Sequence, residues 1–466
     1  MKALYNMPPL SRIVKREMRK IAKKARFVLI LTLLLPAFRL AAEEVTLLAF
    51  CDSHARLGGL NRLRVLAERE RADAPDLLLI DAGDTLQGTF EGAYDRGTAT
   101  LAMLDAMRVD IWVPGNHDFD AGLPPFDRFA GTVLGADWCR EYPDQGESRA
   151  AGEQPPRHSE ADVRPKAAAW TRVERRGRVI VFIGLGESQM PFRRLSWRGD
   201  AEEAALDRVM PEVRRARPDA VVLIRHGGLF WRGGELAGLL RRHPEIDLVI
   251  GGHTHQEHAG ERVGSAWYVQ AGCRAQTLAR IRLDFDERSG RLRRITSELL
   301  QPESGAAPPW PETVRPLVER ARQAAAEPVT VQESDIAEAM RRASGADAAL
   351  YVGRPLPEPL PATAGELYRA LPYEDRIVTV RATPAVVEQL LADEAALAKR
   401  YPGREHRFAA VSDWRRRDRL TLAVTDYYLA GSGGLTLRLR PLIARGAYRD
   451  PGISLREAVQ HPGPPR

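Results

Sequence analysis

Short apolar runs alternate with amphipathic segments from residue 45 to about residue 300. The runs are rich in Val, Ile and Leu, and they read VTLLAF, DLLLID, IWVPG, VIVFIGLG, AVVLIRHGG and DLVIGGHTH. Segments such as GGLNRLRVLAERERA and EEAALDRVMPEVRRAR lie between them. Strands that are apolar on both faces are typical of sheets buried between layers of helices. The alternation therefore predicts a layered α/β domain over residues 43–300.

Polar side chains follow five of these predicted strands, at the point where each strand ends. The residues concerned are Asp52, His54, Asp84, Asn116, His117, His226, His253 and His255. A single histidine after a strand is most often a turn residue, but open α/β sheets gather their ligand sites at the carboxyl ends of strands. Neighbouring glycines such as Gly83 and Gly115 let the backbone pass close to a ligand without a Cβ clash. Five such strand ends together predict one shared site of metal-ligand type.

The motifs DSH, GDTLQG, GNHDFD, RHGG and GGHTH resemble, in order and spacing, the five motifs of the calcineurin-like metallophosphoesterases. The pattern is most similar to the exported 5′-nucleotidase branch of that family. The resemblance covers nearly all of the chain after its N-terminal segment, and it is specific in the first domain and loose in the second. It implies a four-layer α/β fold, a β-sandwich flanked by helices, followed by a smaller α+β C-terminal domain.

The resemblance also implies two divalent metal ions held close together. Seven side chains would be ligands: Asp52, His54 and His255 for the first ion, Asn116, His226 and His253 for the second, and Asp84 as a bridge between them. Mixed imidazole, carboxylate and amide donors suit Zn²⁺, Mn²⁺ or Fe²⁺ better than Ca²⁺, and they do not decide among these three. Two such ions would polarise a phosphoryl oxygen and supply hydroxide from a coordinated water, so the implied reaction is hydrolysis of a phosphate ester.

Within the same resemblance, His117 takes the place of a catalytic histidine that is not a metal ligand. Such a histidine stabilises the transition state or protonates the leaving oxygen. Asp120 would orient its imidazole ring, as a carboxylate fixes the tautomer of a histidine. Asp120 could instead be a helix N-cap or a turn residue, and the sequence leaves this alternative open.

A Pro-rich, aperiodic stretch at 301–314 predicts a linker, which together with a connecting helix fills residues 301–330. A smaller α+β domain is predicted over residues 331–450. The final residues, 451–466, are expected to be a disordered tail.

The second domain would contribute the substrate pocket. By resemblance to the nucleotidase branch, Arg354 would bind the substrate phosphate, and Tyr373 and Tyr428 would sandwich the base, with Tyr427 as the fallback for Tyr428. The sequence departs from the family pattern here, because Arg354 is preceded by YVG and Asp375 stands where Asn is usual. Tyr373 and Tyr428 could equally be ordinary half-buried core tyrosines.

The positive charge of the chain belongs to its N-terminus. The formal net charge is +7, but residues 1–42 hold ten Lys and Arg and one acidic residue, which leaves 59 basic and 61 acidic residues elsewhere. This distribution excludes a basic nucleic-acid-binding face. The basic block precedes the apolar run FVLILTLLLPAF and small residues, which predicts a secretory signal peptide over residues 1–42 and an exported, periplasmic protein. The run is short for a bilayer span. The alternatives are an uncleaved anchor, through which alone the protein would contact a membrane, and a buried helix.

Three cysteines, Cys51, Cys139 and Cys273, fit neither a disulfide framework nor a CxxC metal pattern, and free thiols are expected.

The predicted function is hydrolysis of a small-molecule phosphate ester, a 5′-nucleotide, to nucleoside and phosphate. The protein is expected to act as a monomer. The alternatives are a thiosulfohydrolase-like enzyme, or a nucleotide-sugar or cyclic-nucleotide hydrolase, on the same metal site. A non-catalytic metal-binding protein is a further alternative, against which the complete ligand set argues.

Overall fold

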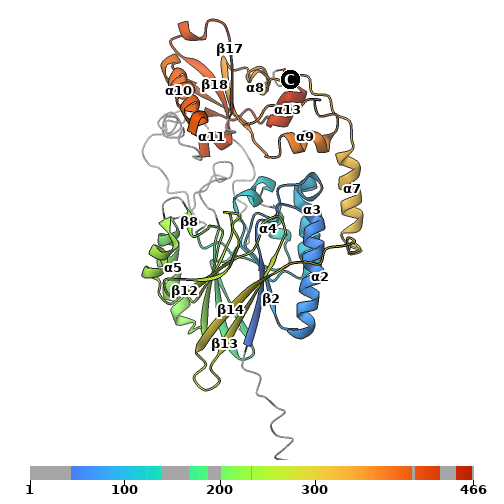
Figure 1. Ribbon diagram of the computed structural model, residues 1–466. Helices are drawn as coiled ribbons and strands as arrows, with labels where there is room; N and C mark the ends of the chain where they lie inside the picture. The colour runs from blue at the N-terminus through green and yellow to red at the C-terminus, as the bar shows by residue number, and fades with distance from the viewer. Residues whose placement is uncertain are drawn as a thin grey trace, which may run out of the picture.

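The structure, a computed structural model, describes residues 44–122, 124–137, 167–186, 201–231, 234–400, 405–430 and 448–463. The predicted signal peptide and Cys139 lie outside these residues. Two bodies are visible in Figure 1, a larger one with two sheets and a smaller one above it, joined along one side by a helix. Among the described residues, no helix is long and apolar enough to cross a membrane.

Two six-stranded sheets form the centre of the larger body. The first has the order β14-β13-β1-β2-β3-β4, with β1 Glu44–Phe50, β2 Leu78–Asp81, β3 Ile111–Trp112, β4 Thr132–Val133, β13 Leu278–Phe285 and β14 Leu292–Leu300. The second has the order β11-β12-β10-β7-β6-β5, with β5 Trp170–Arg175, β6 Arg178–Leu185, β7 Ala220–Arg225, β10 Leu248–Gly251, β11 His258–Val263 and β12 Ala266–Gln270. Strands β1 to β4 run parallel to one another, as do β6, β7, β10 and β12.

Helices cover the outer face of each sheet, which completes four layers (Figure 1). The first sheet carries α2 (Leu57–Asp73), α3 (Phe90–Met107) and the short α4 (Pro124–Arg128), and the second carries α5 (Glu202–Arg215) and α6 (Leu236–Arg242). A short hairpin, β8 (Phe230–Trp231) and β9 (Gly234–Glu235), precedes α6. The predicted β-sandwich flanked by helices is therefore confirmed.

Strand β1 illustrates why apolar runs mark the strands of this domain. Successive side chains of a strand point to opposite faces. Leu47 and Ala49 accordingly pack into the core between the two sheets, whereas Leu48 and Phe50 pack against α2 and α3. Because both faces are covered, the strand is apolar at nearly every position.

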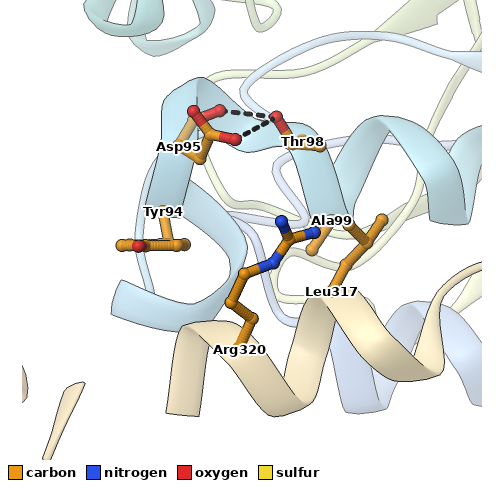
Figure 2. A pocket seen from close by; sticks show the side chains of 6 residues that line it. All are labelled: Tyr94, Asp95, Thr98, Ala99, Leu317 and Arg320. Carbon is orange, nitrogen blue, oxygen red and sulfur yellow. Dashed lines mark hydrogen bonds between the residues drawn. The ribbon is translucent and has the colours of Figure 1, made fainter. Parts of the chain in front are cut away.

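Helix α7 (Arg315–Ala325) connects the two bodies and packs along α3. Helix α3 is interrupted by non-helical residues from Tyr94 to Gly97, and α7 contacts it there. Figure 2 shows a small pocket at this point, between Tyr94, Asp95 and Thr98 of α3 and Arg320 of α7. The Thr98 hydroxyl donates to the Asp95 carbonyl at 2.6 Å and closes the turn.

The smaller body contains a five-stranded sheet of order β17-β15-β18-β16-β19. Its strands are β15 Ala348–Val352, β16 Ile377–Ala382, β17 His406–Ala410, β18 Leu420–Thr425 and β19 Tyr448–Arg449. Its helices are α8 Ile336–Ser344, α9 Ala364–Ala370, α10 Pro384–Arg400, α11 Asp426–Ala430 and α13 Leu455–Gln460, with a 3₁₀ turn at Trp414–Arg416. This is the mixed α+β architecture expected for the second domain.

The predicted disordered tail at 451–466 is corrected by α13. Ser454 caps this helix by accepting a hydrogen bond from the Glu457 amide, and Leu455, Ala458 and Val459 are buried against α8. The spacing of Ser454 and Glu457 is that of a capping box, a signal that was present in the sequence. We propose domain limits of 43–300 and 331–463, with 301–330 between them.

Candidate metal centre and active site

Six of the predicted ligands lie in two groups at the carboxyl ends of β1, β2, β7 and β10. Asp52, His54 and His255 form one group, and Asp84, His226 and His253 form the other. Within each group, one donor atom from each residue lies within 4.8 Å of the others. The structure therefore brings together, from distant parts of the chain, the side chains that the motifs singled out.

Five of these residues adopt a left-handed backbone conformation that non-glycine residues rarely take. Their φ angles are 48° for Asp52, 47° for His54, 55° for Asp84, 71° for His253 and 56° for His255. Each such residue costs about 1–3 kcal/mol, and it persists only where its surroundings fix it. Here the amides of Asp52 and His54 donate to the carbonyls of Gly83 and Asp84 at 2.7 and 2.9 Å. The loops thus hold the ligands in place before anything binds.

Asp118 is a buried residue of this site that the sequence analysis missed. Its carboxylate accepts hydrogen bonds from the backbone amides of Asp84, Thr85, Leu86 and Gly115, at 2.7–2.9 Å. It therefore ties the loop that carries Asp84 to the loop that carries Asn116 and His117. Burial and the charge of Asp84 raise its pKa to about 6, against the effect of these amides. The signal in the sequence was a second acidic residue within GNHDFD.

The donor atoms of this site fit divalent cations. His226 Nδ1 lies 2.7 Å from the Ala82 carbonyl, which leaves Nε2 facing Asp84 Oδ2 at 3.3 Å. The Nε2 atoms of His54 and His255 face each other at 3.0 Å, and His54 Nδ1 is occupied by the Gln87 carbonyl. Two ring nitrogens directed at one point suit a shared cation better than a hydrogen bond between them.

Asn116 and the neighbouring glycine support the same conclusion. The buried Oδ1 of Asn116 has no hydrogen-bond partner among the residues that the structure describes. A buried amide oxygen without a partner is costly, so a cation would satisfy it. A Cβ at Gly115 would overlap the Asp84 carboxylate and the His226 ring, which explains why glycine stands there.

The electrostatics of the groups show how strongly the carboxylates favour positive charge. Burial lowers the pKa of His226, but the charge of Asp84 outweighs it and raises the pKa to about 10. Burial and the charge of His226 lower the pKa of His253 to about 4. The Asp84 carboxylate thus favours positive charge beside it, which suits a cation at this position.

His117 and Asp120 form the pair that the sequence analysis expected. His117 Nδ1 lies 3.1 Å from Asp120 Oδ2, and the His117 amide donates to Asp84 Oδ1 at 2.8 Å. The 3₁₀ helix that carries them begins at Asn116 with Gly115 as its cap, so Asp120 is not a helix N-cap. Burial lowers the pKa of His117, but Asp84 and the bond to Asp120 raise it to about 9.

Tyr373 of the smaller body reaches this pair. Its ring stacks on the His117 ring with centroids 5.5 Å apart and an angle of 23° between the planes, and half of the residue is exposed. Gln87 Nε2 donates to the carbonyl of Pro372 at 2.7 Å, directly beside Tyr373. Arg354 lies on the loop after β15, exposed, and forms no hydrogen bond or ion pair with any described residue. The structure therefore brings Tyr373 to the site without joining Arg354 to it.

The structure corrects the choice between the two adjacent tyrosines of α11. Tyr428 is 5% exposed, packs in the core of the smaller body and donates its hydroxyl to Glu394. Tyr427 is 50% exposed. The Asp426 carboxylate accepts from the amides of Tyr427 and Arg376, which places Tyr427 beside the loop that carries Tyr373. Because a base cannot stack on an enclosed ring, the structure favours the fallback, Tyr427.

A cavity of about 650 Å³ lies between the two bodies, next to this site. Its lining includes Phe90, Tyr94 and Asp120 from the larger body and Tyr368 and Arg456 from the smaller one.

Two of the three cysteines lie among the described residues. Cys51, beside Asp52, and Cys273 are both free thiols, as expected.

Comparisons with known proteins agree with this geometry. Residues 45–257 match the model of the calcineurin-like phosphoesterase family. The trifunctional nucleotide phosphoesterase protein YfkN of Bacillus subtilis is 26% identical over 272 residues, which cover 49% of this chain and 18% of that protein. The 5′-nucleotidase of Rattus norvegicus is 24% identical over 255 residues, 49% of this chain and 41% of that protein. This chain thus spans less than half the length of these curated relatives.

The fold has solved counterparts. The structure of a 5′-nucleotidase precursor from Thermus thermophilus superimposes with a TM-score of 0.59 at 19% identity, covering 90% of this chain and 96% of that one. The likeness extends over both bodies, so it confirms the two-part fold. Together with the matched family model, it confirms the resemblance read from the motifs. Residues 45–257 therefore form a calcineurin-like phosphoesterase domain, a hydrolase domain that proteins named as 5′-nucleotidases resemble.

Proposed function

We propose that this protein is a metal-dependent phosphohydrolase that releases phosphate from 5′-nucleotides. The observation that carries the proposal is the juxtaposition of two metal-ligand groups, the His117–Asp120 pair and an exposed aromatic ring from the second domain. The first two features suit phosphate-ester hydrolysis, and the third suits a substrate with an aromatic base. The names of the relatives, a nucleotide phosphoesterase and a 5′-nucleotidase, support the same substrate class.

We assign the metal ligands as the motifs suggest. Asp52, His54 and His255 would hold one ion, Asn116, His226 and His253 the other, and Asp84 both. Divalent cations held there would polarise the phosphoryl group and activate water for in-line attack. The mixed donors suit Zn²⁺, Mn²⁺ or Fe²⁺.

His117 would act on the leaving oxygen. With Asp120 accepting a hydrogen bond from Nδ1–H, the other ring nitrogen, Nε2, is left to donate its proton to the ester oxygen as the bond breaks. The bond to Asp120 fixes the ring orientation and stabilises the protonated form. Asp120 is thus the positioning partner and His117 the acid.

The base would be held between Tyr373 and Tyr427. Both rings are half exposed, Tyr373 on its loop and Tyr427 on the neighbouring α11, and tyrosine faces stack on any base. We retain Arg354 as the phosphate-binding residue on the resemblance alone, since a guanidinium matches phosphate geometry.

Substrate preference is the direct test of the base-binding residues. Removing Tyr373 or Tyr427 should cost roughly 1–3 kcal/mol of stacking, a loss of about five- to 150-fold in kcat/KM for AMP. A small aryl phosphate has no base, so its hydrolysis should change little. The measurement is kcat/KM for both substrates on wild type, Tyr373→Ala and Tyr427→Ala, with a chelator abolishing all activity.

Tyr428→Ala is the matched control, because it removes the adjacent ring. It should lower the free energy of unfolding by roughly 3–5 kcal/mol, as loss of a buried aromatic does, and leave the preference for AMP unchanged. If both exposed-tyrosine variants hydrolyse AMP normally, the base is not bound there. Hydrolysis of cyclic nucleotides or nucleotide sugars, or thiosulfohydrolase activity, in place of AMP hydrolysis would then indicate the alternative functions.

We also propose that the protein is exported and that about its first 42 residues are removed, because a basic block precedes a short apolar run there. N-terminal sequencing of the protein from the cell envelope should find a start near Glu43. A cytoplasmic protein that begins at Met1, or at Met18 if translation starts there, would rule this out.

A further inference from the structure

Arg456, the second residue of α13, binds the loop that carries Tyr373. Its Nη1 atom donates to the carbonyls of Leu371 and Tyr373 at 2.7 and 3.1 Å. Its Nη2 atom forms an ion pair with Glu374. The guanidinium also lies over the ring of Tyr368, 4.9 Å from its centroid. One side chain thus satisfies three residues of a loop that has no regular secondary structure.

The larger body also binds this loop, through Gln87. The Pro372 carbonyl, between the two that Arg456 binds, accepts from Gln87 of the larger body at 2.7 Å. The Gln87 carbonyl in turn accepts from His54 Nδ1 at 3.2 Å. The three carbonyls of residues 371–373 are therefore all held, two by α13 and one by a residue next to a metal ligand.

Helix α13 itself is firmly attached, so it can serve as an anchor. The Leu455 amide donates to the Asp375 carbonyl, and the Ile377 amide donates to the Ile453 carbonyl, both at 2.9 Å. The Arg456 side chain is 18% exposed. A charged hydrogen-bond network of this kind, mostly shielded from water, is stronger than an exposed ion pair.

We propose that Arg456 is a positioning residue that sets the preference for nucleotides by fixing the 371–374 loop with Tyr373 stacked on His117. This inference rests on the proposed function, because it presumes that Tyr373 contacts a base. Without Arg456, two carbonyls lose a hydrogen-bond donor and Glu374 loses this ion pair. The loop becomes more mobile, and the ring of Tyr373 spends less time where a base can stack.

The test combines kinetics with amide hydrogen exchange. Arg456→Ala should lower kcat/KM for AMP by about fivefold or more, and by no more than Tyr373→Ala does, with the small aryl phosphate changed less than about twofold. Arg456→Lys should lie in between, because an ammonium cannot bind two carbonyls and a carboxylate in the geometry of a guanidinium. The Arg456→Ala/Tyr373→Ala double variant should be no worse than Tyr373→Ala alone, because the two act in series.

Arg369→Ala is the matched control. Arg369 lies on neighbouring α9, its side chain is 74% exposed, and its ion pair with Glu366 is 4.0 Å long. This variant should leave both substrates unchanged. Hydrogen exchange of residues 371–376 should rise in Arg456→Ala but not in Arg369→Ala.

Three outcomes would contradict this role of Arg456 or the proposed function on which it rests. If Arg456→Ala lowers hydrolysis of both substrates equally, or if its effect adds in full to that of Tyr373→Ala, Arg456 does not act through Tyr373. If exchange in the loop is unchanged, the positioning itself is refuted. A wild type that hydrolyses the aryl phosphate but not AMP removes the nucleotide role together with the proposed function, while the exchange data still decide whether Arg456 fixes the loop.

Discussion

Replacing Asp84 with alanine will remove bound metal and hydrolytic activity together. Its carboxylate is buried within one of the two ligand groups, with Oδ2 3.3 Å from His226 Nε2 and Oδ1 accepting the His117 amide at 2.8 Å, and by the motif resemblance it would bind both ions. The cations of a dinuclear site contribute several kcal/mol to transition-state stabilisation, so kcat/KM should fall by roughly 10³-fold or more.

Elemental analysis of the purified variant beside its kinetics measures both effects. Asp110→Ala is the matched control, because its carboxylate accepts a backbone amide, that of Leu79, at 2.8 Å in the same sheet. Asp110 precedes β3 and so lies at the edge opposite to the site. This control should keep its metal and its activity, whereas an Asp84→Ala protein that retains two ions would contradict the bridging role.

His117→Asn should separate chemistry from metal binding. His117 lies outside both ligand groups, and its ring is held by Asp120 at 3.1 Å. The variant should therefore keep its metal while kcat falls by roughly 10²–10⁴, which is the usual contribution of a positioned acid or base. Measurement of metal content and kcat on the same preparation tests this.

The chain offers a close control for this variant. His258 forms the same kind of pair with an acid three residues later, Glu261, at 2.5 Å, but on β11 and outside the ligand groups. His258→Asn should leave kcat unchanged. Stoichiometric loss of metal from His117→Asn would show that His117 is a ligand.

The fold of the larger body explains why Asp84 and His117 could be identified from the sequence. The layered fold follows from strands such as β1, whose unbroken apolar run is possible only when both faces are covered. Parallel strands then bring their carboxyl ends to one edge, so polar residues after each strand, such as Asp84 and His226, must meet. Local patterns therefore predicted one shared site at this edge, whereas the division of its residues into two ligand groups came from the family resemblance.

The supporting contacts were not predictable in this way. Asp118 joins two loops more than thirty residues apart, and nothing local shows which amides its carboxylate will meet. The left-handed backbone at Asp52 and His255 is imposed by neighbouring loops, against the local preference of these residues.

The second domain shows most clearly which features follow from the local sequence and which depend on tertiary packing. Tyr427 and Tyr428 are adjacent on α11, and successive helical residues point about 100° apart, so one faces the core and the other faces outward. The sequence determined that two aromatic residues stand there. Only the packing of α10, with Glu394 beneath the hydroxyl of Tyr428, decided which ring is exposed. In the same way, the sequence placed a Ser–Glu pair before the end of the chain, but the contacts of α13 with α8 and with the Tyr373 loop decided that Arg456 lies beside the candidate site. Burial and long-range hydrogen bonds depend on residues far away in the chain, and for that reason local patterns could not supply them.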